Sequence, residues 1–413
     1  MDRMPLRIVA NRPDPAILNL PWSTPLEDWS DEYVVPLPRG LSRHVVRIVR
    51  LGRRTYAIKE TTEEIAFREY RLLRELDRLR LPTVLAQGVV AGRTDSQQNP
   101  LPTALLTEHL RFSLPYRSLF SHGLTVENIP SLVDALVVLL VRLHLSNFYW
   151  GDVSLSNVLF RRDAGAFSAY LVDAETGELH PTLSERLREH DVTVGCENVF
   201  AELLDLEASN AVEGDVAVFA IVDRIRERYD ALWSELTGAE QFGADEMWRI
   251  EQRIERLNDL GFDVDELDIN TGVDGDQIQI RPRVVELGHH RRELQELTGM
   301  NVEDNQARRL LNDLASYTAN CDLSREDRDV VANQWMSRYY EPIVALVPPE
   351  LRGKLEAPEV YHEILHHRWT LSEQAGREVD IFEAARDYIQ HVLSRRPDEV
   401  MAPPEMPPPA LTT

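Results

Sequence analysis

Cysteine and long hydrophobic runs are both scarce in this sequence of 413 residues. Cys196 and Cys321 are the only cysteines and lack a metal-like spacing, which excludes a disulfide scaffold and is typical of a reduced cytoplasmic protein. The most apolar stretch, residues 132–145, is interrupted by Asp134 and Arg142 and is too short to span a bilayer. The N-terminus also lacks the apolar segment of a signal peptide, so we expect a soluble, cytoplasmic chain without a transmembrane segment.

Basic residues are fewer than acidic residues, and lysine is almost absent. Asp and Glu total 69 against 45 Lys and Arg, which gives a formal net charge of -24. Such an acidic surface repels nucleic acid and anionic membranes, so we expect neither as a partner. Only Lys59 and Lys354 are lysines, and every other basic residue counted here is an arginine. A chain that uses arginine almost everywhere retains lysine where an ammonium group is required, which makes Lys59 a candidate functional residue.

The composition that is present, 43% hydrophobic and 28% charged, is that of a folded chain with two to three domains. Residues 1–32 form an irregular lead-in without clear period. A β-rich part follows, with a helix that begins near Thr61 or Thr62 and strands at 33–38, 44–51, 55–59, 84–90 and 104–109. Helical periodicity then predominates. We expect a buried helix at 131–145, strands at 158–161 and 169–172, and helices over most of 184–260. A hairpin at 266–285 and helices at 304–317 and 384–395 are expected to follow.

Four polar features follow one another in a fixed order. Lys59 ends a strand, and Glu69 lies ten residues later in the next helix. Asp152 and Asn157 stand five apart in the loop after the buried helix, and Asp173 ends a later strand. Phosphoryl transfer from ATP needs a compact cation on the phosphates, Mg²⁺ bound by carboxylate and amide oxygens, and a carboxylate that takes the proton of the acceptor hydroxyl.

These residues match those needs one by one. Lys59, held by Glu69, would bind the phosphates. Asn157 and Asp173 would bind Mg²⁺, and Asp152 would act as the catalytic base. Each residue also has a simpler interpretation, because strand ends and turns often contain Lys, Asp and Asn, and the helix offers other glutamates. The order of the whole set favours ATP- and Mg²⁺-dependent phosphoryl transfer.

The motifs around these residues resemble the protein-kinase-like superfamily, which includes protein kinases, aminoglycoside and choline kinases and bacterial lipopolysaccharide-core kinases. Ala57-Ile-Lys59 is similar to the Val-Ala-Ile-Lys strand, and Asp152 with Asn157 has the spacing of the catalytic loop. Leu143-His144 precedes this loop as in many kinases, and Leu106-Thr-Glu-His-Leu110 resembles the adenine-binding hinge, with Thr107 as gatekeeper. The resemblance covers about residues 33–200. The whole chain also resembles an actinobacterial family of kinase-like proteins whose C-terminal domain has no assigned function.

The resemblance implies an α+β fold, a two-lobed protein-kinase-like domain followed by a mostly α-helical C-terminal domain. We expect an N-lobe over residues 33–110, a C-lobe over 111–240, a helical domain with a small hairpin over 241–400 and a disordered Pro-rich tail over 401–413. ATP contacts are expected at Gly40, Arg43, Lys59, Thr107, Glu108 and Leu110. A run of arginines without acidic residues from 34 to 59 supports a phosphate site, although a solvated strand face is the simpler alternative.

Several positions depart from the kinase motifs. Trp150-Gly151-Asp152 replaces His-Arg-Asp, so the arginine that binds a phosphorylated activation loop is missing, and Asp173-Ala174-Glu175 replaces Asp-Phe-Gly. Ser154 stands where Ser/Thr kinases have a lysine, and the glycine-rich loop retains only Gly40. These departures favour a small-molecule, glycan or lipid acceptor over a regulated protein substrate. The alternatives are a pseudokinase, a nucleotide-binding scaffold that acts through its C-terminal domain, and a helical interaction protein that binds no nucleotide.

A second motif, His362-Glu-Ile-Leu-His366, matches the His-Glu-x-x-His pattern of zinc enzymes. No third ligand stands at metzincin spacing, so we interpret these histidines, like the pairs His289-His290 and His366-His367, as helix-surface or interhelical residues. Six tryptophans are interpreted as core or interdomain anchors: Trp22, Trp29, Trp233, Trp248, Trp335 and Trp369. Such anchors would let the C-terminal domain pack on the kinase-like body or form a homodimer.

Overall fold

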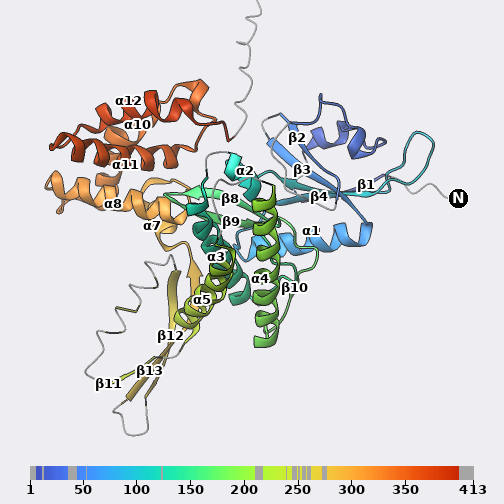
Figure 1. Cartoon of the computed structure of the whole chain (residues 1–413), viewed down its shortest axis with the longest axis horizontal. Helices are drawn as coiled ribbons and strands as arrows, with labels where there is room; N and C mark the ends of the chain where they lie inside the picture. Colours follow the sequence, from blue (N-terminus) through green and yellow to red (C-terminus); the bar gives the residue numbers. More distant parts are fainter. Residues whose placement is uncertain are drawn as a thin grey trace, which may run out of the picture. The chain divides into compact units, whose positions relative to one another are not determined.

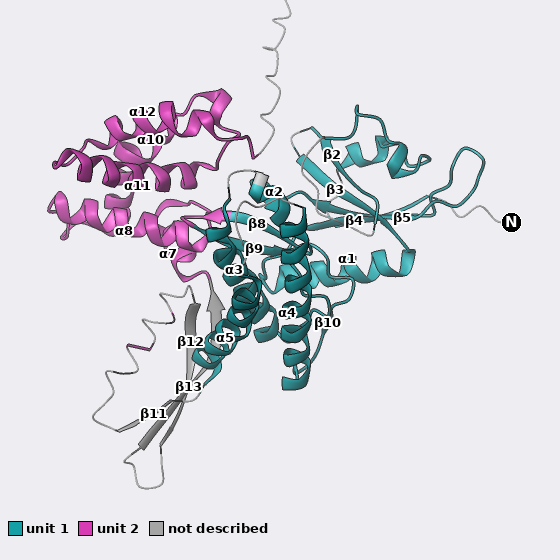
Figure 2. Cartoon of the chain, in the orientation of Figure 1, with its two compact units in different colours: residues 1–161, 166–238 teal, residues 162–165, 239–413 magenta. Residues whose placement is uncertain are grey.

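The structure, a computed structural model, divides the chain into two compact units. Unit 1 contains residues 1–161 and 166–238, and unit 2 contains residues 162–165 and 239–413 (Figure 1 and Figure 2). The residues that the structure describes are 6–11, 14–35, 44–52, 54–121, 124–209, 217–238, 240–243, 249, 252–253, 257, 262–271 and 277–399. Among them, no helix combines the length and the apolar character needed to cross a bilayer.

A five-stranded antiparallel sheet organises the first part of unit 1, with its strands in the order β1-β4-β5-β3-β2. The strand bounds are Arg7–Ala10 for β1, Val46–Leu51 for β2, Arg54–Thr61 for β3, Ala86–Ala91 for β4 and Thr103–Glu108 for β5. Helix α1, Glu63–Arg78, packs against β4 and β5 (Figure 1). Thr62 caps this helix by accepting a hydrogen bond from Ile65 N, and the helix places Glu69 on its buried face.

The N-terminal lead-in is more ordered than its sequence pattern predicts, so the expectation of an irregular segment over residues 1–32 is wrong in part. β1 pairs with β4 along its whole length, and two 3₁₀ helices follow at Pro15–Asn19 and Leu26–Asp28. Trp22 and Trp29 are buried, as expected, in an apolar cluster with side chains of β2, β3 and β5. The segment shows no periodicity because it buries its tryptophans from loops and short turns, without a regular helix or strand face.

The strand expected at residues 33–38 is also not formed as predicted. Within the described residues it is reduced to a single bridge between Val34 and Val49, and residues 36–38 lie outside the described part of the chain.

The second part of unit 1 is built around α3, Ile129–Leu145, whose sequence is apolar on nearly all sides. This helix packs against α5 and β9. The remaining helices of the unit are α2 (Tyr116–Ser121), the 3₁₀ helix Val126–Asn128, α4 (Glu185–Ala208) and α5 (Val218–Thr237). The remaining strands are β6 (Ser113–Pro115), β7 (Phe148–Tyr149), β8 (Val158–Asp163), β9 (Ala166–Leu171) and β10 (Glu178–Leu179). Strands β6, β8 and β9 form one small sheet, and β7 pairs with β10.

Unit 2 combines a small sheet with a group of helices. The sheet has the order β11-β13-β12, and the pairing of β12 with β13 confirms the expected hairpin. Its strands are β11 (Glu240–Gly243), β12 (Phe262–Thr271) and β13 (Gln277–Leu287). The helices are α7 (His289–Thr298), α8 (Asp304–Asn320), α9 (Arg328–Trp335), a π-helical turn (Met336–Tyr340), α10 (Glu341–Ala345), α11 (Ala357–Ala375) and α12 (Ile381–His391), with 3₁₀ turns at Pro349–Leu351 and Leu393–Arg395.

The helices of unit 2 share one apolar core with a polar centre. Trp335 is buried as expected, and its Nε1 donates a hydrogen bond to Asp313 Oδ2 at 2.8 Å. Tyr361 donates to the same oxygen at 2.8 Å, so both aromatic side chains have a partner. Trp369 is 58% exposed, so its expected role as a buried anchor is wrong. The buried part of α11 ends at Leu365, and the helix continues beyond the core before Trp369 is reached.

Candidate active site

Three acidic side chains surround Lys59. Its Nζ lies 2.7 Å from Glu69 Oε2, 3.1 Å from Asp173 Oδ2 and 3.6 Å from Glu175 Oε2. The lysine comes from β3, Glu69 from α1, and the other two acids from the loop after β9. The Lys59 side chain is only 13% exposed, so water screens these attractions weakly. The structure therefore brings three predicted site residues together, and it selects Glu69 among the glutamates of α1.

Burial changes the ionisation of the pair formed by Lys59 and Glu69. The Glu69 side chain is 1% exposed, and this burial raises its pKa from the ordinary 4.5 to about 7, against the opposing effect of Lys59. Burial alone would lower the pKa of Lys59, but the carboxylates of Glu69 and Asp173 outweigh it and raise that pKa. Lys59 therefore stays charged near neutral pH, as a phosphate-binding group must.

Glu175 extends the cluster to a third carboxylate. One oxygen each from Glu69, Asp173 and Glu175 lies within 4.8 Å of the others. Glu175 Oε2 is also 3.1 Å from Nε2 of His44, and Glu175 N donates to Asp173 Oδ1 at 3.0 Å. The position that holds glycine in the kinase Asp-Phe-Gly motif thus carries a carboxylate close to the lysine.

The predicted base and the predicted metal ligand contact each other in the catalytic loop. Asn157 Nδ2 donates to Asp152 O and to Asp152 Oδ2, both at 3.0 Å. Asn198 Nδ2, from α4, donates to Asp152 Oδ1 at 3.3 Å. Val172 N donates to Asn157 O at 3.1 Å, which joins this loop to the strand end that carries Asp173. Two amides thus fix the Asp152 carboxylate, which is only partly buried.

One face of α4 binds the backbone of the catalytic loop. Asp191, whose side chain is 0% exposed, accepts hydrogen bonds from the N–H groups of residues 150 and 151 at 2.8 and 2.7 Å. Glu202 accepts from the N–H groups of residues 155 and 156, both at 2.8 Å. Hydrogen bonds from backbone N–H groups to carboxylates are strong, so the loop is held at both of its ends.

Sequence reasoning missed Asp191, Asn198 and Glu202. Their spacing of seven and four residues places them on one side of a helix, and Gly195 lies on the same side. A Cβ atom on Gly195 would lie 2.9 Å from Val153 Cγ1, so glycine permits the close approach of the loop. The sequence does contain a signal for this role of the helix, because polar residues and a glycine share one side of a helix whose other buried side chains are mostly apolar.

His144, the histidine of the Leu-His pair, supports the same contact. Its Nε2 lies 3.0 Å from Asp191 Oδ2, and its Nδ1 lies 2.7 Å from the Tyr229 hydroxyl. Burial lowers the pKa of His144, so the ring is neutral near pH 7 and positions Asp191 as a hydrogen-bonding partner.

The expected hinge is the end of β5. Thr107 is buried and lies opposite Ala57, two residues before Lys59 on β3. The Glu108 carboxylate accepts a hydrogen bond from Gln87 at 3.0 Å, and Leu110 O accepts one from a serine hydroxyl. The ATP contacts of Thr107, Glu108 and Leu110 stay predictions. Gly40 and Arg43 lie outside the described residues.

Oxygen donors suited to Mg²⁺ stand beside the lysine. Asp173 and Glu175 offer carboxylates, and Asn157 donates through its Nδ2, which leaves its Oδ1 as an acceptor. Mg²⁺ prefers such hard oxygen ligands together with water and phosphate oxygens. The residues present therefore fit Mg²⁺, with Asn157 and Asp173 as the predicted ligands and Glu175 as a further one.

The His-Glu-x-x-His motif does not gather a metal-ligand set in the described part of the chain. Glu363 accepts hydrogen bonds from Arg396 and from the Tyr388 hydroxyl. His366 packs beside Trp369, and His362 lines a cavity of unit 2. Among the described residues, two clusters of three possible ligands occur, and neither contains His362 or His366. These contacts support their interpretation as helix histidines.

Comparison with known proteins gives two family matches that lie one after the other. Residues 44–194 match the model of the Lipopolysaccharide kinase (Kdo/WaaP) family, and residues 231–393 match a domain of unknown function, DUF4032. No curated protein matches the chain significantly. Matching solved structures include one described as WaaP in complex with acyl carrier protein, with 16% sequence identity, a TM-score of 0.36, and coverage of 62% of this chain and 99% of that chain.

The family matches confirm the resemblance to kinase-like proteins. The first matched segment contains Lys59, Glu69, Asp152, Asn157 and Asp173, and the second contains helices α7 to α12 of unit 2. The fold class is also confirmed, because an α+β kinase-like domain precedes a mostly helical domain along the chain.

Proposed function

We propose that this protein is a phosphotransferase that transfers the γ-phosphoryl group of ATP·Mg²⁺ to a hydroxyl group of a small molecule, glycan or lipid. The observation that carries the proposal is the contact of Lys59 with both Glu69 and Asp173. This contact joins a phosphate-binding cation to a metal-binding carboxylate, which is the central requirement of phosphoryl transfer. The match of residues 44–194 to a lipopolysaccharide kinase family supports a sugar hydroxyl as the acceptor.

Each residue has a role that its surroundings permit. Lys59, held by Glu69, binds the phosphates, and Asp173 and Asn157 would hold Mg²⁺. When bound, Mg²⁺ neutralises charge on the β- and γ-phosphates. Asp152 orients the acceptor hydroxyl and takes its proton as the new oxygen–phosphorus bond forms and the bond to the leaving ADP breaks.

The test is ADP release by the full chain, incubated with ATP·Mg²⁺ in the presence and absence of sugars and glycolipids. We expect acceptor-dependent ADP release, which Asp152→Asn lowers by roughly 10²–10⁴-fold, the usual contribution of a general base. Because Asp152 faces the acceptor, ATP·Mg²⁺ should stabilise this variant as it stabilises the wild type, by about 2.7 kcal/mol at 100-fold excess over Kd. Asp77→Asn, at an exposed position of α1, is the matched control and should change neither quantity.

One observation favours a second candidate, a pseudokinase that binds nucleotide and acts as a scaffold. Glu175 places an additional carboxylate 3.6 Å from Lys59, where phosphates would otherwise contact the ammonium group. In that case ATP·Mg²⁺ would raise the melting temperature, but no acceptor would produce ADP and Asp152→Asn would equal the wild type. An unchanged melting temperature at saturating ATP·Mg²⁺ would reject both candidates.

A further inference from the structure

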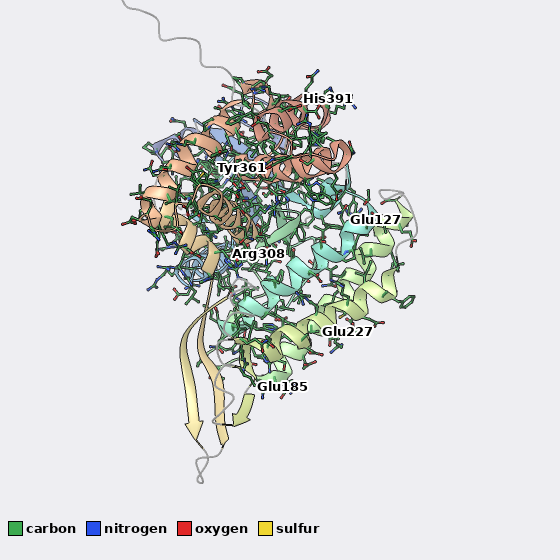
Figure 3. The ribbon with its side chains drawn as sticks, turned by 90° about the vertical axis from the view of Figure 1, so that its left-hand side faces the viewer. Glu127, Glu185, Glu227, Arg308, Tyr361 and His391 are labelled. Carbon is green, nitrogen blue, oxygen red and sulfur yellow. The ribbon has the colours of Figure 1, made fainter. Side chains whose placement is uncertain are left out.

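A cavity of about 1030 Å³ lies within unit 2, apart from any residue of the proposed phosphotransferase site. Its lining comes mainly from α7 and α8, with further residues from the segment that follows α8 and from α9, and α11 contributes His362. Figure 3 labels the lining residue Arg308 on α8, and Tyr361 on α11, which directly precedes His362. The chain has a net charge of -24, yet this lining is rich in basic and imidazole groups: His289, His290, Arg308, Arg309, Arg328 and His362.

Two of these histidines form a compact cluster with a glutamate. His289 and His290 are the first residues of α7, and Glu293 follows one turn later on the same side of the helix. One possible ligand atom from each residue lies within 4.8 Å of the others. The two imidazole rings are 5.1 Å apart and nearly perpendicular. Two imidazoles and one carboxylate form a ligand set typical of open zinc sites, in which a fourth position is left for water or substrate.

The surroundings of the His290 side chain favour its use as a metal ligand. Its Nε2 is buried and has no hydrogen-bond partner among the described residues. A buried polar atom without a partner destabilises the folded chain, and coordination to a metal would give this nitrogen a partner.

The surrounding charges decide which metal fits. The N-terminus of α7 and the guanidinium of Arg308 oppose a bound cation, whereas Glu293 and Asp304 favour it. Glu293 is also paired with Arg328 at 2.6 Å, so a metal would share its carboxylate. Hard cations such as Mg²⁺, which prefer several carboxylates, are disfavoured here, but Zn²⁺ and related ions gain affinity from imidazole.

We propose that His289, His290 and Glu293 bind one divalent transition-metal ion of the Zn²⁺ type, with an open coordination position towards the arginine-lined cavity. The arginines around that position match an anionic fourth ligand, such as a phosphate or carboxylate group. This site is independent of the phosphotransferase proposal, because its three ligands all belong to unit 2 and none belongs to the kinase-like segment.

The experiment is a titration of the chelator-treated full chain with Zn²⁺ in excess Mg²⁺, which keeps the predicted Mg²⁺ site filled. We expect one tightly bound Zn²⁺ per chain. His290→Gln and Glu293→Gln should each weaken binding by more than about 100-fold, beyond the 10–100-fold effect of residues that only support a ligand. His366→Gln, in the motif that gathers no ligand set, is the matched control and should bind as the wild type does.

Circular dichroism and melting of the metal-free variants show whether each one folds. Glu293 has a side chain that is 32% exposed, so Glu293→Gln keeps the test valid if His290→Gln does not fold. Zn²⁺ binding that neither variant weakens would overturn the proposal, as would loss of binding in His366→Gln alone.

A second readout tests the open position. Co²⁺ bound by two imidazoles and a carboxylate gives a visible absorption band that depends on the fourth ligand. Inorganic phosphate should change this band in the wild type, and Arg309→Gln should require at least about 10-fold more phosphate for the same change. A band that phosphate leaves unaltered would contradict an open position towards the arginines.

Discussion

At the scale of single residues, Lys59 can be compared directly with Lys354, the other lysine of the chain. Both side chains are 13% exposed and both pair with an acid, since Lys354 Nζ lies 3.4 Å from Asp398 Oδ1. Guanidinium is planar and larger than ammonium, so it cannot replace the point charge between Glu69 and Asp173. We expect Lys59→Arg to weaken ATP·Mg²⁺ binding by about 10-fold or more, measured by calorimetry, which is about 1.4 kcal/mol. Lys354→Arg should bind like the wild type, and equal affinities of both variants would contradict the phosphate role.

Glu69 predicts a pH dependence of stability. Its pKa of about 7 in the folded chain exceeds the ordinary 4.5, so between these values the folded state binds more protons than the unfolded state. Stability should therefore fall as pH rises through this window, by about 3 kcal/mol at most. Glu69→Gln should remove most of this fall in urea unfolding at pH 5 and pH 7. The exposed neighbour Glu64 gives the control Glu64→Gln, which should keep the wild-type slope.

At the residue level, the contact of Lys59 with Glu69 could be predicted because each residue stands at a recognisable strand end or helix position. The structure adds Asp173 to this contact, and the functional roles of these residues stay predictions. The contact of His44 with Glu175 could not, because it joins residues 131 positions apart and depends on how the loop after β9 folds. The sequence identified Glu175 only as a departure from the kinase motif, and its proximity to Lys59 was not predicted.

At the scale of elements, α4 determines the geometry of the catalytic loop. Asp191→Asn would replace one acceptor oxygen with an NH₂ group that faces a backbone N–H, leaving a buried donor without a partner. We expect a loss of about 1–3 kcal/mol in urea unfolding, together with lower turnover because the loop that carries Asp152 shifts. Glu197→Gln, on the exposed face of the same helix, should leave both stability and turnover unchanged. Wild-type turnover in Asp191→Asn would show that α4 does not position the base.

Element prediction was most successful where periodicity is strong. The buried helix α3, the alternating strand β3 and the almost fully buried strand β5 can be recognised in the sequence because their buried residues follow a regular pattern. β1 was missed because a strand of four residues is too short to establish alternation, and its pairing partner β4 lies far along the chain. The role of α4 was missed because three polar side chains on its inner face make it resemble a solvated helix.

At the scale of the whole molecule, the chain is not divided into continuous segments, although the sequence predicts such a division. The boundary expected near residue 240 assumes that each domain is one continuous segment. Residues 162–165 nevertheless belong to unit 2, although they form only the end of β8 and the turn to β9. No local signal marks such a segment, because its membership depends on partners more than 130 positions away. The boundary between the two lobes near residue 110 stays a prediction.

The last prediction concerns Asp163, which makes this discontinuity testable. Its carboxylate is 2% exposed and accepts hydrogen bonds from Gln306 N at 2.8 Å and Asn305 Nδ2 at 2.9 Å, at the N-terminus of α8. A carboxylate there is stabilised by two donors and by the helix dipole. In the full chain, Asp163→Asn should lower the free energy of unfolding by about 1–3 kcal/mol, measured in urea. In a chain that ends after Gly238 both donors are missing, so the same substitution should lower the free energy of unfolding by less than it does in the full chain. Equal losses in the two chains would mean that Asp163 acts within residues 1–238 alone, and that α8 does not depend on it.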